Sequence, residues 1–500
     1  MDKIRILQLG KEDFRTKYEL PDTVELTYVE RLTEFSGKPY DLVFLDRTPR
    51  KGELALLRQA AKAYTLFITE HVDVEEMGWL YQEKRAKRID RKDVQKFLLQ
   101  EAHYYYRKPY GEKLKPCNLT ISRNFSGSVK WNGNYSVSLN GDFGNEFGQT
   151  AYWRNNIPVF QGQRIDLWLE YKKDPGVSVS LVITGFIRGS ISEILERKEF
   201  SEEELNDVIQ IGGFPTDASV FLSLHAKGSG ALSIIALHDR HSRGSHGFFL
   251  PGGKRCATSE REEVFYYFEP GDGKPPLNVF FSGYKTRQGF EGYNLMKKLG
   301  SPFLLLAEAR LEGGCFYMGS KEYERLYVRI IRNHMKKLGF SPGETIFSGL
   351  SMGAYGALYY SCAVRPHAVI LGKPLASIGN VAANETYLRP GGFPTSLDVL
   401  KYLCQNTDRD AVKKLNDRFW NKFDAVDWGN TKFIMSYMAE DDYDPDAYQT
   451  LLSHLCSGGV QVYGKGIHGR HNDNTMGVIH WFLGQFGKIL KEDFFRKMED

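Results

Sequence analysis

A serine flanked by glycines is the residue of this sequence best suited to act as a nucleophile. The motif Gly-x-Ser-x-Gly occupies Gly349–Gly353, with Ser351 at its centre. An apolar stretch with strand character, Thr345–Ser348, precedes the motif, and a helical pattern over Ala354–Ala363 follows it. A strand that turns sharply into a helix exposes the serine and directs the first helical amides toward a developing oxyanion. The motif therefore predicts covalent catalysis by Ser351.

This strand–serine–helix arrangement is the nucleophile elbow of the α/β-hydrolase fold, in which an acid and then a histidine follow the serine along the chain. The acid is expected at the end of a late strand. An acidic cluster follows the expected strand Phe433–Tyr437, and Asp441 or Asp442 is the predicted acid. Glu440 and Asp444 are the alternatives. Spacing alone does not decide between neighbouring positions at a strand end, so the choice stays open.

Two histidines lie in the loop before the last expected helix, where the general base of this fold belongs. His471 is favoured because it is nearest the helix start at residues 474–475, and His468 is the alternative. His454 and His480 lie within helical patterns and are interpreted as structural.

An oxyanion formed on the substrate needs hydrogen-bond donors near the serine. The amide of Met352, directly after the nucleophile, is the first candidate. The second donor should follow an early strand, and Gly283 and Tyr284 come soon after the strand pattern Val279–Phe281. Serine, acid, histidine and donors in this order indicate acyl chemistry, with either water or a hydroxyl group as the acceptor.

The elements that must position these residues lie in the segment 260–500. Strand and helix patterns alternate there, which predicts an α/β-hydrolase domain with a parallel sheet covered by helices on both faces. The stretch from Gly372 to Trp428 is long enough for a lid or an acceptor wall, and Arg389–Pro394 predicts a rigid loop within it. The expected strands are Val279–Phe281, Phe303–Ala307, Thr345–Ser348, Val369–Leu371, Phe433–Tyr437 and Val460–Tyr463, and the expected long helices are Glu322–Leu338 and Thr475–Leu490.

Residues 1–115 also alternate strand and helix patterns, which predicts a small Rossmann-like α/β domain. Only Gly10 follows the first strand before the acidic pair Glu12–Asp13, so the glycine-rich cradle of a dinucleotide site is missing. We therefore interpret this domain as non-catalytic. The basic run Lys84–Arg88 is interpreted as a solvated helix face. The expected strands are Ile4–Leu9, Val24–Val29, Asp41–Asp46 and Thr65–Thr69, and the expected helices are Glu53–Ala63 and Asp93–His103.

Residues 116–250 alternate apolar and polar positions, which is typical of the strands of a β-sandwich. Asn132-Gly133 and Asn140-Gly141 have the composition of tight hairpin turns. A helix is expected over Ser201–Val208, and a linker over Ser242–Arg255. The expected strands are Ser128–Trp131, Tyr135–Leu139, Ile165–Tyr171, Val177–Thr184, Val220–Leu224 and Ala231–Leu237.

Three tryptophans and two histidines of this middle segment have alternative interpretations. Trp131, Trp153 and Trp168 are either core aromatics of the sandwich or platforms on which sugar rings stack. His238 and His241 have the spacing of two metal ligands, but no carboxylate pattern accompanies them, so a polar loop is the better interpretation. No metal site is predicted.

The overall composition argues against several classes of protein. Of the 500 residues, 42% are hydrophobic and 26% are charged, a balance typical of soluble globular domains. No apolar stretch reaches the roughly eighteen residues of a membrane span, and the first residues lack the apolar segment of a signal peptide. With 66 basic and 62 acidic residues the net charge is +4, which does not favour nucleic-acid binding. The six cysteines form no CxxC pair and indicate reduced thiols.

Over nearly its whole length the chain resembles the family of second accessory secretory proteins, which belong to the accessory Sec system. Firmicutes use that system to export serine-rich repeat adhesins. The residues that carry the resemblance are Phe347–Gly356, Tyr437–Pro445 with its acidic run, and Gly469–Asp473. The resemblance implies an O-acetyltransferase that modifies N-acetylglucosamine on the glycosylated adhesin. Its nucleophile and base would be Ser351 and His471, with an acid near position 441; because the family's acid can be a glutamate, that position stays open.

The same resemblance implies partners and a location. It implies a complex with the first and third accessory secretory proteins that delivers the adhesin to the accessory Sec ATPase. Such a protein would be cytoplasmic and would meet the inner face of the membrane through the translocon. No tightly bound cofactor is implied, and acetyl-CoA is one candidate for an acetyl donor that no nucleotide fingerprint identifies. The alternative functions are a non-enzymatic adaptor of export, and a carbohydrate esterase or other serine hydrolase.

Overall fold

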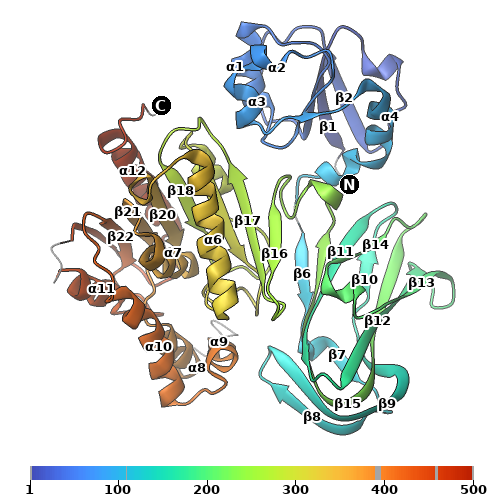
Figure 1. Ribbon diagram of the computed structural model, residues 1–500, viewed down its shortest axis with the longest axis vertical. Coiled ribbons are helices and arrows are strands. Elements are labelled where there is room, and N and C mark those ends of the chain that lie inside the picture. The colour runs from blue at the N-terminus through green and yellow to red at the C-terminus, as the bar shows by residue number, and fades with distance from the viewer. Residues whose placement is uncertain (1–2, 109, 389–395, 457–459, 498–500) are drawn as a thin grey trace.

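The strands of the protein form three sheets in a computed structural model that describes residues 3–108, 110–388, 396–456 and 460–497. In the view of Figure 1 the first sheet lies above the second, and the third lies to the left of both. None of the helices in the described ranges combines the length and the apolar character that a membrane span requires. The expected rigid loop Arg389–Pro394 lies outside the described residues.

The first sheet is parallel, with the strand order β2-β1-β3-β4-β5. Separate apolar clusters form around it, as expected for a parallel sheet whose crossover helices cover its faces. The four strands expected here are therefore confirmed. The elements are β1 (Ile4–Leu9), β2 (Val24–Val29), β3 (Leu42–Leu45), β4 (Leu66–Ile68), β5 (Lys87–Arg88), α1 (Lys51–Ala60), α2 (Val74–Met77), α3 (Trp79–Glu83) and α4 (Arg91–Gln100).

The interpretation of the basic run Lys84–Arg88 as a solvated helix face is wrong. The helix α3 ends at Glu83, and the last two residues of the run form strand β5. Lys84 is buried, and its ammonium lies 3.2 Å from the Glu83 carboxylate. Its long apolar stem is covered while its charge is paired, an arrangement that the count of charges in the sequence does not reveal.

The second sheet contains ten strands around one apolar core. All ten are connected through the two longest strands, and the sheet curves around this core (Figure 1), in agreement with the sandwich-like domain expected here. Its first strand lies before residue 115, within the range expected for the first domain. The strands are β6 (Gly111–Leu114), β7 (Leu119–Ile121), β8 (Ser126–Asn132), β9 (Ser136–Trp153), β10 (Ile157–Val159), β11 (Arg164–Lys173), β12 (Val177–Ile187), β13 (Ile194–Phe200), β14 (Ile209–Gly212) and β15 (Ala218–His241).

Strand β15 joins two stretches that the sequence analysis separates. Val220–Leu224 and Ala231–Leu237 belong to one strand of 24 residues. Between them Gly228 and Gly230 have positive φ angles of 92° and 134°, and the pairing with β9 shifts its register at Gly228. These glycines therefore form irregularities within a continuous strand, where the sequence analysis expected two separate strands.

Of the other local predictions for this segment, some are confirmed and some are wrong. Asn132-Gly133 does join β8 to β9 in a hairpin, whereas Asn140-Gly141 lies inside β9 and pairs with β15. The expected helix over Ser201–Val208 is a single 3-10 turn at Glu204–Asn206. Neither Asn140 nor Gly141 has a positive φ angle, and a Cβ on Gly141 would lie 2.5 Å from the carbonyl oxygen of Ser126, so this glycine permits the close approach of β8 and does not form a turn.

The burial of the tryptophan and histidine side chains distinguishes between the alternative interpretations given for them. Trp153 and Trp168 are core residues, whereas the side chain of Trp131 is 48% exposed. The prediction of a polar loop around His238 and His241 is wrong, because both residues lie in β15 and His238 is fully buried, 3.2 Å from the Glu170 carboxylate.

The expected linker Ser242–Arg255 is a packed segment. Arg243 within it is buried and donates hydrogen bonds to two carbonyl oxygens that follow α4, those of Tyr104 and Tyr106. Its last residues form a strand of the third sheet. The glycines of the stretch thus permit close packing here, not a loose connection.

The third sheet has the strand order β16-β17-β19-β18-β20-β21-β22-β23. Counted within this sheet the order is 1-2-4-3-5-6-7-8, with antiparallel pairing at β16 and β17 and parallel pairing elsewhere. This is the α/β-hydrolase topology that the serine motif predicted. The first two strands, which the sequence analysis missed, are β16 (Lys254–Ala257) and β17 (Glu263–Glu269); the others are β18 (Leu277–Phe281), β19 (Phe303–Glu308), β20 (Thr345–Leu350), β21 (Ala368–Gly372), β22 (Lys432–Met438) and β23 (Val462–Ile467).

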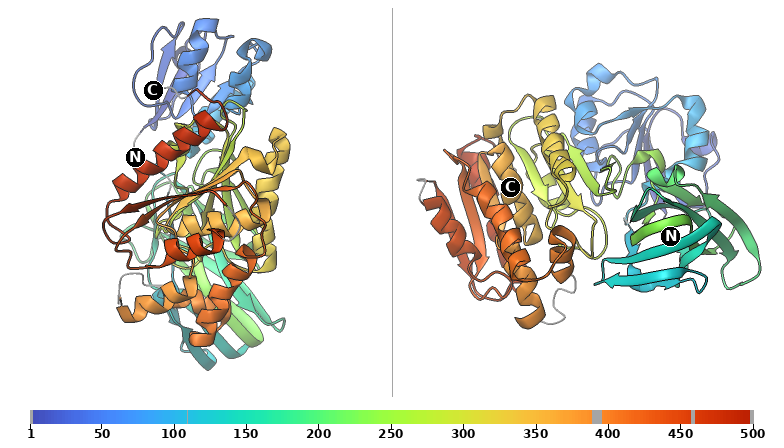
Figure 2. Two further views of the ribbon diagram at one scale, coloured as in Figure 1. Left: turned by 90° about the vertical axis from the view of Figure 1, so that its left-hand side faces the viewer. Right: turned by 60° about the horizontal axis from the view of Figure 1, so that its bottom comes forward.

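Helices cover both faces of the third sheet, and each face has its own apolar cluster. In Figure 2 the helix α12 crosses one face while α6 lies on the other. Among the described residues between β21 and β22, three helices are inserted, in the stretch expected to form a lid or wall. The helices are α5 (Tyr293–Lys297), α6 (Lys321–Leu338), α7 (Met352–Val364), the inserted α8 (Ile378–Leu388), α9 (Ser396–Cys404) and α10 (Arg409–Phe423), and finally α11 (Ala447–Cys456) and α12 (Thr475–Glu492).

A buried network of charges joins the second sheet to the third. Arg240 of β15 donates to both oxygens of the Glu263 carboxylate on β17, and the Nη1–Oε1 distance is 2.8 Å. Arg255 of β16 donates to the same carboxylate. Burial alone would raise the pKa of Glu263, but the two guanidinium groups hold it well below its usual range. The network therefore depends on one ionised carboxylate.

Removing that carboxylate should destabilise the protein strongly. Glu263→Ala leaves two buried guanidinium groups without their shared partner, and we expect it to lower the free energy of unfolding by about 3–5 kcal/mol. Asp417→Ala removes the exposed i,i+4 partner of Lys413 and should cost at most about 0.5 kcal/mol. Denaturant unfolding followed by circular dichroism compares the two variants, and equal losses would contradict the role given to Glu263.

Candidate active site

Ser351 lies at the turn between β20 and α7, at the carboxyl edge of the third sheet. Its backbone angles are φ 54° and ψ −120°, a strained conformation for a residue with a side chain. A Cβ atom on Gly349 would lie 2.2 Å from the carbonyl group of Gly353, and one on Gly353 would lie 2.1 Å from the carbonyl oxygen of Phe281. Only glycine fits at these positions, so the motif spacing follows from the close approach of α7 to two strands.

A continuous chain of hydrogen bonds runs from Ser351 through His471 to Asp441. Ser351 Oγ lies 2.8 Å from His471 Nε2, and His471 Nδ1 lies 2.8 Å from Asp441 Oδ2. His471 and Asp441 are 1% and 8% exposed. The other carboxylate oxygen accepts hydrogen bonds from the amides of residues 443 and 444. In such a geometry the histidine can take the hydroxyl proton while the carboxylate stabilises the imidazolium that forms.

The alternative residues lie outside this chain. Asp442 accepts a hydrogen bond from the backbone amide of His471 at 3.0 Å, which fixes the loop and not the imidazole. The His468 side chain is 95% exposed and pairs with Glu440. Asp444 accepts two amide hydrogen bonds from residues 376 and 377, at the entry to the inserted helices. The structure thus brings His471 and Asp441 to the serine and leaves the other candidates in supporting positions.

The remaining histidines considered in the sequence analysis lie in helices. His454 is in α11, with Nδ1 2.6 Å from the Asp424 carboxylate, and its ring stacks on Trp420. His480 is an exposed residue of α12.

The predicted oxyanion donors have different environments. Met352 is the first residue of α7, and the amide of a first helical residue has no acceptor within its helix. The Gly283 amide donates to Glu291 Oε2 at 2.8 Å, so this donor is engaged within the protein. Tyr284, the next residue, lines the same cavity as Ser351. The amides of Met352 and Tyr284 are therefore the remaining pair of candidates.

Ser351 and His471 border a cavity of about 730 Å³. Its size is within the roughly 300–1,000 Å³ of small-molecule sites. Leu375 and Val381 of the inserted stretch contribute to its wall, so part of that stretch does form one side of the site. Many of the lining side chains are apolar or aromatic; they include Phe280, Tyr284, Phe290, Tyr293, Phe316, Leu350, Leu375 and Val381.

Two side chains that hold His471 in place were missed by the sequence analysis. Lys373 directly follows β21, and its ammonium donates to the carbonyl oxygen of Asp473 at 2.9 Å and to the hydroxyl of Thr475 at 3.0 Å. Burial lowers the pKa of Lys373. The ring of Tyr443 stacks on His471 with 4.3 Å between ring centroids. The position of Lys373 at the carboxyl end of a central strand could have indicated it, whereas no sequence signal marks Tyr443.

Comparison with known proteins finds a family that matches the whole chain, not only its serine motif. The family model described as "Asp2: Accessory Sec system GspB-transporter" matches residues 4–496. The chain belongs to this family. It is 37% identical to the accessory Sec system protein Asp2 of Streptococcus gordonii, over 99% of each chain. It is 34% identical to the protein of that name from Staphylococcus aureus strain NCTC 8325, over 99% of this chain and 98% of that one.

A solved structure shows the same arrangement of the three sheets. It is a chain of the "Glycosylation Associate Protein (Gap123) complex from Streptococcus agalactiae", with a TM-score of 0.87 and 34% identity. The match covers 99% of this chain and 100% of that one. The resemblance stated from three short motifs is therefore confirmed over the full length, and the first two sheets belong to the family as much as the third does.

The assignment of base can be tested without knowing the substrate. A fluorophosphonate probe reacts with activated serines, and we expect it to label Ser351 of the wild type. His471→Ala should slow labelling by roughly 10³-fold or more, because the serine loses its general base. His468→Ala is the matched control and should label like the wild type. Labelling kinetics followed by intact-protein mass spectrometry measure both, and equal rates for the two variants would exclude His471 as the base.

The steric account of the elbow makes a separate prediction. Gly353→Ala places a methyl group against the carbonyl oxygen of Phe281 and should abolish probe labelling and lower the melting temperature. Gly484→Ala, in α12, has no atom within 4 Å of the new Cβ and should raise stability by roughly 0.5–1 kcal/mol. Wild-type labelling by the Gly353→Ala protein would show that α7 is not held against β18.

Proposed function

We propose that this protein is an O-acetyltransferase of accessory Sec export that acetylates N-acetylglucosamine on a glycosylated serine-rich repeat adhesin. The hydrogen-bonded chain from Ser351 through His471 to Asp441 carries the proposal, because it is an arrangement suited to acyl transfer. Membership of the accessory Sec family supports export as the setting of this function.

The first half of the reaction loads the serine. His471 Nε2 takes the proton of Ser351 Oγ as that oxygen attacks the carbonyl carbon of an acetyl ester or thioester. The amides of Met352 and Tyr284 would stabilise the oxyanion of the tetrahedral intermediate. When the intermediate collapses, the leaving group takes the proton from His471, and an acetyl ester remains on Ser351. Asp441 stays ionised throughout and stabilises the imidazolium.

The second half transfers the acetyl group to the sugar. A sugar hydroxyl gives its proton to His471 and attacks the acetyl carbon, and the restored Ser351 hydroxyl receives that proton as the ester bond to the enzyme breaks. Water in place of the sugar would give hydrolysis, which is the esterase alternative. The apolar lining favours transfer, since it disfavours free water around the acyl enzyme while the acceptor is bound.

We also propose that the protein assembles with other accessory Sec proteins, namely the first and third accessory secretory proteins, and meets the accessory Sec ATPase at the inner face of the membrane. The similar structure from Streptococcus agalactiae is described as a Gap123 complex, which supports assembly of related chains. A purely non-enzymatic adaptor is the competing function, and it predicts that the serine is dispensable.

Mass spectrometry of the glycans on the co-expressed adhesin tests the proposal. With wild-type protein we expect acetyl-sized mass additions on N-acetylglucosamine, and with Ser351→Ala we expect none, because no acyl enzyme can form. His468→Ala is the control with an altered histidine and should retain the additions. Acetylation that persists in Ser351→Ala would exclude this nucleophile.

The same cells distinguish the enzyme from the adaptor. The amount of adhesin exported with Ser351→Ala reports on delivery, and co-purification of the first and third accessory secretory proteins reports on assembly. Absence of acetyl groups with both wild type and variant, together with normal export, would support the adaptor. Release of acetate from an activated acetyl ester by purified wild-type protein would then support an esterase.

A further inference from the structure

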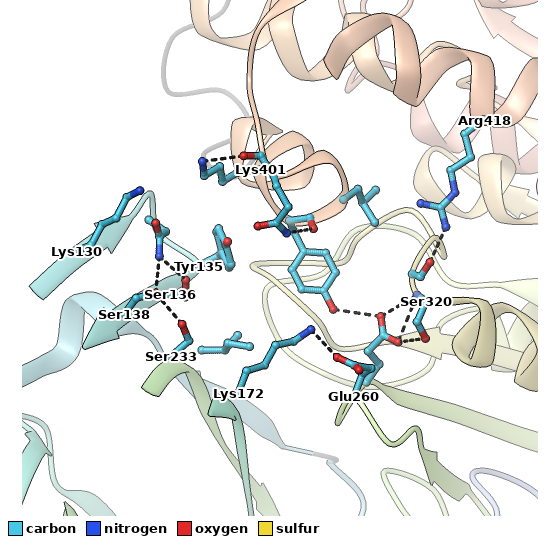
Figure 3. A pocket seen from close by; sticks show the side chains of 17 residues that line it. Lys130, Tyr135, Ser136, Ser138, Lys172, Ser233, Glu260, Ser320, Lys401 and Arg418 are labelled. Atoms are coloured by element: carbon cyan, nitrogen blue, oxygen red, sulfur yellow. Dashed lines mark hydrogen bonds and ion pairs between the residues drawn. The ribbon is translucent and has the colours of Figure 1, made fainter. Parts of the chain in front are cut away.

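A second cavity, of about 660 Å³, lies between the second sheet and the third (Figure 3). One wall is formed by residues of β8, β9, β11 and β15, and the other by the segment before β17, the start of α6, and α9 and α10. It shares no lining residue with the cavity at Ser351. Its size also falls within the roughly 300–1,000 Å³ of small-molecule sites.

The wall from the second sheet is a row of groups that both donate and accept hydrogen bonds. Asn132 Nδ2 donates to the hydroxyls of Ser136 and Ser138, at 3.1 and 2.9 Å. The Ser138 hydroxyl in turn lies 2.6 Å from that of Ser233. Figure 3 shows Ser136, Ser138 and Ser233 along one side of the cavity. Hydroxyl and amide groups held in a row suit a ligand that itself carries many hydroxyls.

The two carboxylates of the opposite wall are paired within the protein. Glu260 pairs with Lys172 across the cavity at 2.8 Å. Glu262 accepts hydrogen bonds from Arg310 at 2.9 Å and from the Tyr402 hydroxyl at 3.2 Å. Such pairing neutralises both carboxylates of the lining, while the ammonium groups of Lys130 and Lys401 can donate hydrogen bonds to the hydroxyls of a polar ligand.

The cavity also offers aromatic surface. Tyr135 and Tyr402 come from opposite walls and meet edge to face, with 6.0 Å between their ring centroids. Rings of this kind pack against the C–H faces of sugars while nearby hydroxyls bind their polar edges. Trp131 lies between two lining residues of β8 and is not part of the lining, as expected because successive side chains of a strand point to opposite faces.

The two walls are joined at one rim. Asp398 of α9 is buried and accepts a hydrogen bond from the backbone amide of Asn134, in the hairpin between β8 and β9, at 3.1 Å. A Cβ on Gly133 would lie 2.1 Å from the same carboxylate, so the hairpin packs closely on the helix. The polar groups of the cavity are thus preorganised, which reduces the entropy lost on binding.

We propose that this cavity is a second, non-catalytic binding site for a neutral oligosaccharide chain. It goes beyond the proposed acetyl transfer, since binding here requires neither Ser351 nor an acetyl donor. Its place between the second sheet and the inserted helices would let the protein hold one part of a glycan while another part reaches the serine.

Isothermal titration of the full-length protein with tri-N-acetylchitotriose tests the proposal. The protein is used with Ser351 capped by the fluorophosphonate probe, so that the catalytic cavity is blocked. We expect binding to persist after capping. In capped protein that also carries Asn132→Ala and Ser138→Ala, affinity should fall by about tenfold or more, because two hydrogen-bonding side chains are lost. Loss of binding on capping alone would place the sugar at Ser351 and overturn the proposal.

Control variants separate the site from its surroundings. Trp131→Ala, on the other face of β8, should bind within about twofold of the capped wild type. Lys130→Met alters an exposed residue of the cavity rim, so it should fold normally, and it should weaken binding measurably if the sugar occupies the cavity. Melting temperatures check that each variant is folded. No binding of the trisaccharide to capped wild type, unchanged binding in both cavity variants, or displacement of the sugar by inorganic phosphate would each overturn the proposal.

Discussion

The close approach of α7 to the strands beneath it is the constraint on which the rest of the candidate active site depends. Gly353 touches the end of β18, and Gly349 leaves room for the first turn of the helix. The amide of Ser351 donates to the carbonyl oxygen of Gly372 at the end of β21. The serine is therefore fixed by three neighbouring parallel strands, and the strain in its backbone is held by packing that side chains at the two glycines would prevent.

Parallel strands also explain why residues so far apart in the sequence meet. Strands β21, β22 and β23 are neighbours, and the loops after their carboxyl ends supply Lys373, Asp441 and His471. The other two loops are both tied to the histidine loop: Lys373 contacts it through Asp473, and Asp442 accepts a hydrogen bond from the His471 amide. The imidazole is thus oriented by backbone and side-chain contacts from two directions, which fixes the proton acceptor before any substrate is bound.

Much of this site could be predicted from the sequence, and the parts that could not share a physical reason. The order of serine, acid and histidine is visible because each follows a strand pattern. The choices between Asp441 and Asp442 and between His468 and His471 are not, since a shift of one to three residues in a loop reverses the direction of a side chain without changing any periodicity. The engagement of the Gly283 amide by Glu291 is a tertiary contact that no spacing reveals.

In the middle of the chain, local sequence patterns likewise fail to predict where whole strands begin and end. Alternation correctly predicted a β-rich segment, but the expected turn at Asn140-Gly141 lies inside strand β9, and the two strands expected on either side of Gly228 are one strand with an irregularity. Whether a glycine ends a strand or bends it depends on the partner strand, and the pairing of β9 with β15 is set across about 90 residues of chain, too far for a local pattern to record.

The architecture bears on whether the protein is an enzyme, an adaptor or both. A binding surface for partner proteins requires neither a serine held at a positive φ nor a buried carboxylate–imidazole pair, and both cost stability. Retaining them is understandable if the hydroxyl reacts. The first two sheets and the inserted α9 nevertheless extend far beyond what the serine needs, and the buried Arg240–Glu263 pair fixes the second sheet against the third. Rigid attachment of a large β-rich surface to the domain that carries Ser351 would suit a protein that holds an extended substrate in a defined orientation, so the proposed catalytic and delivery functions are compatible in one chain.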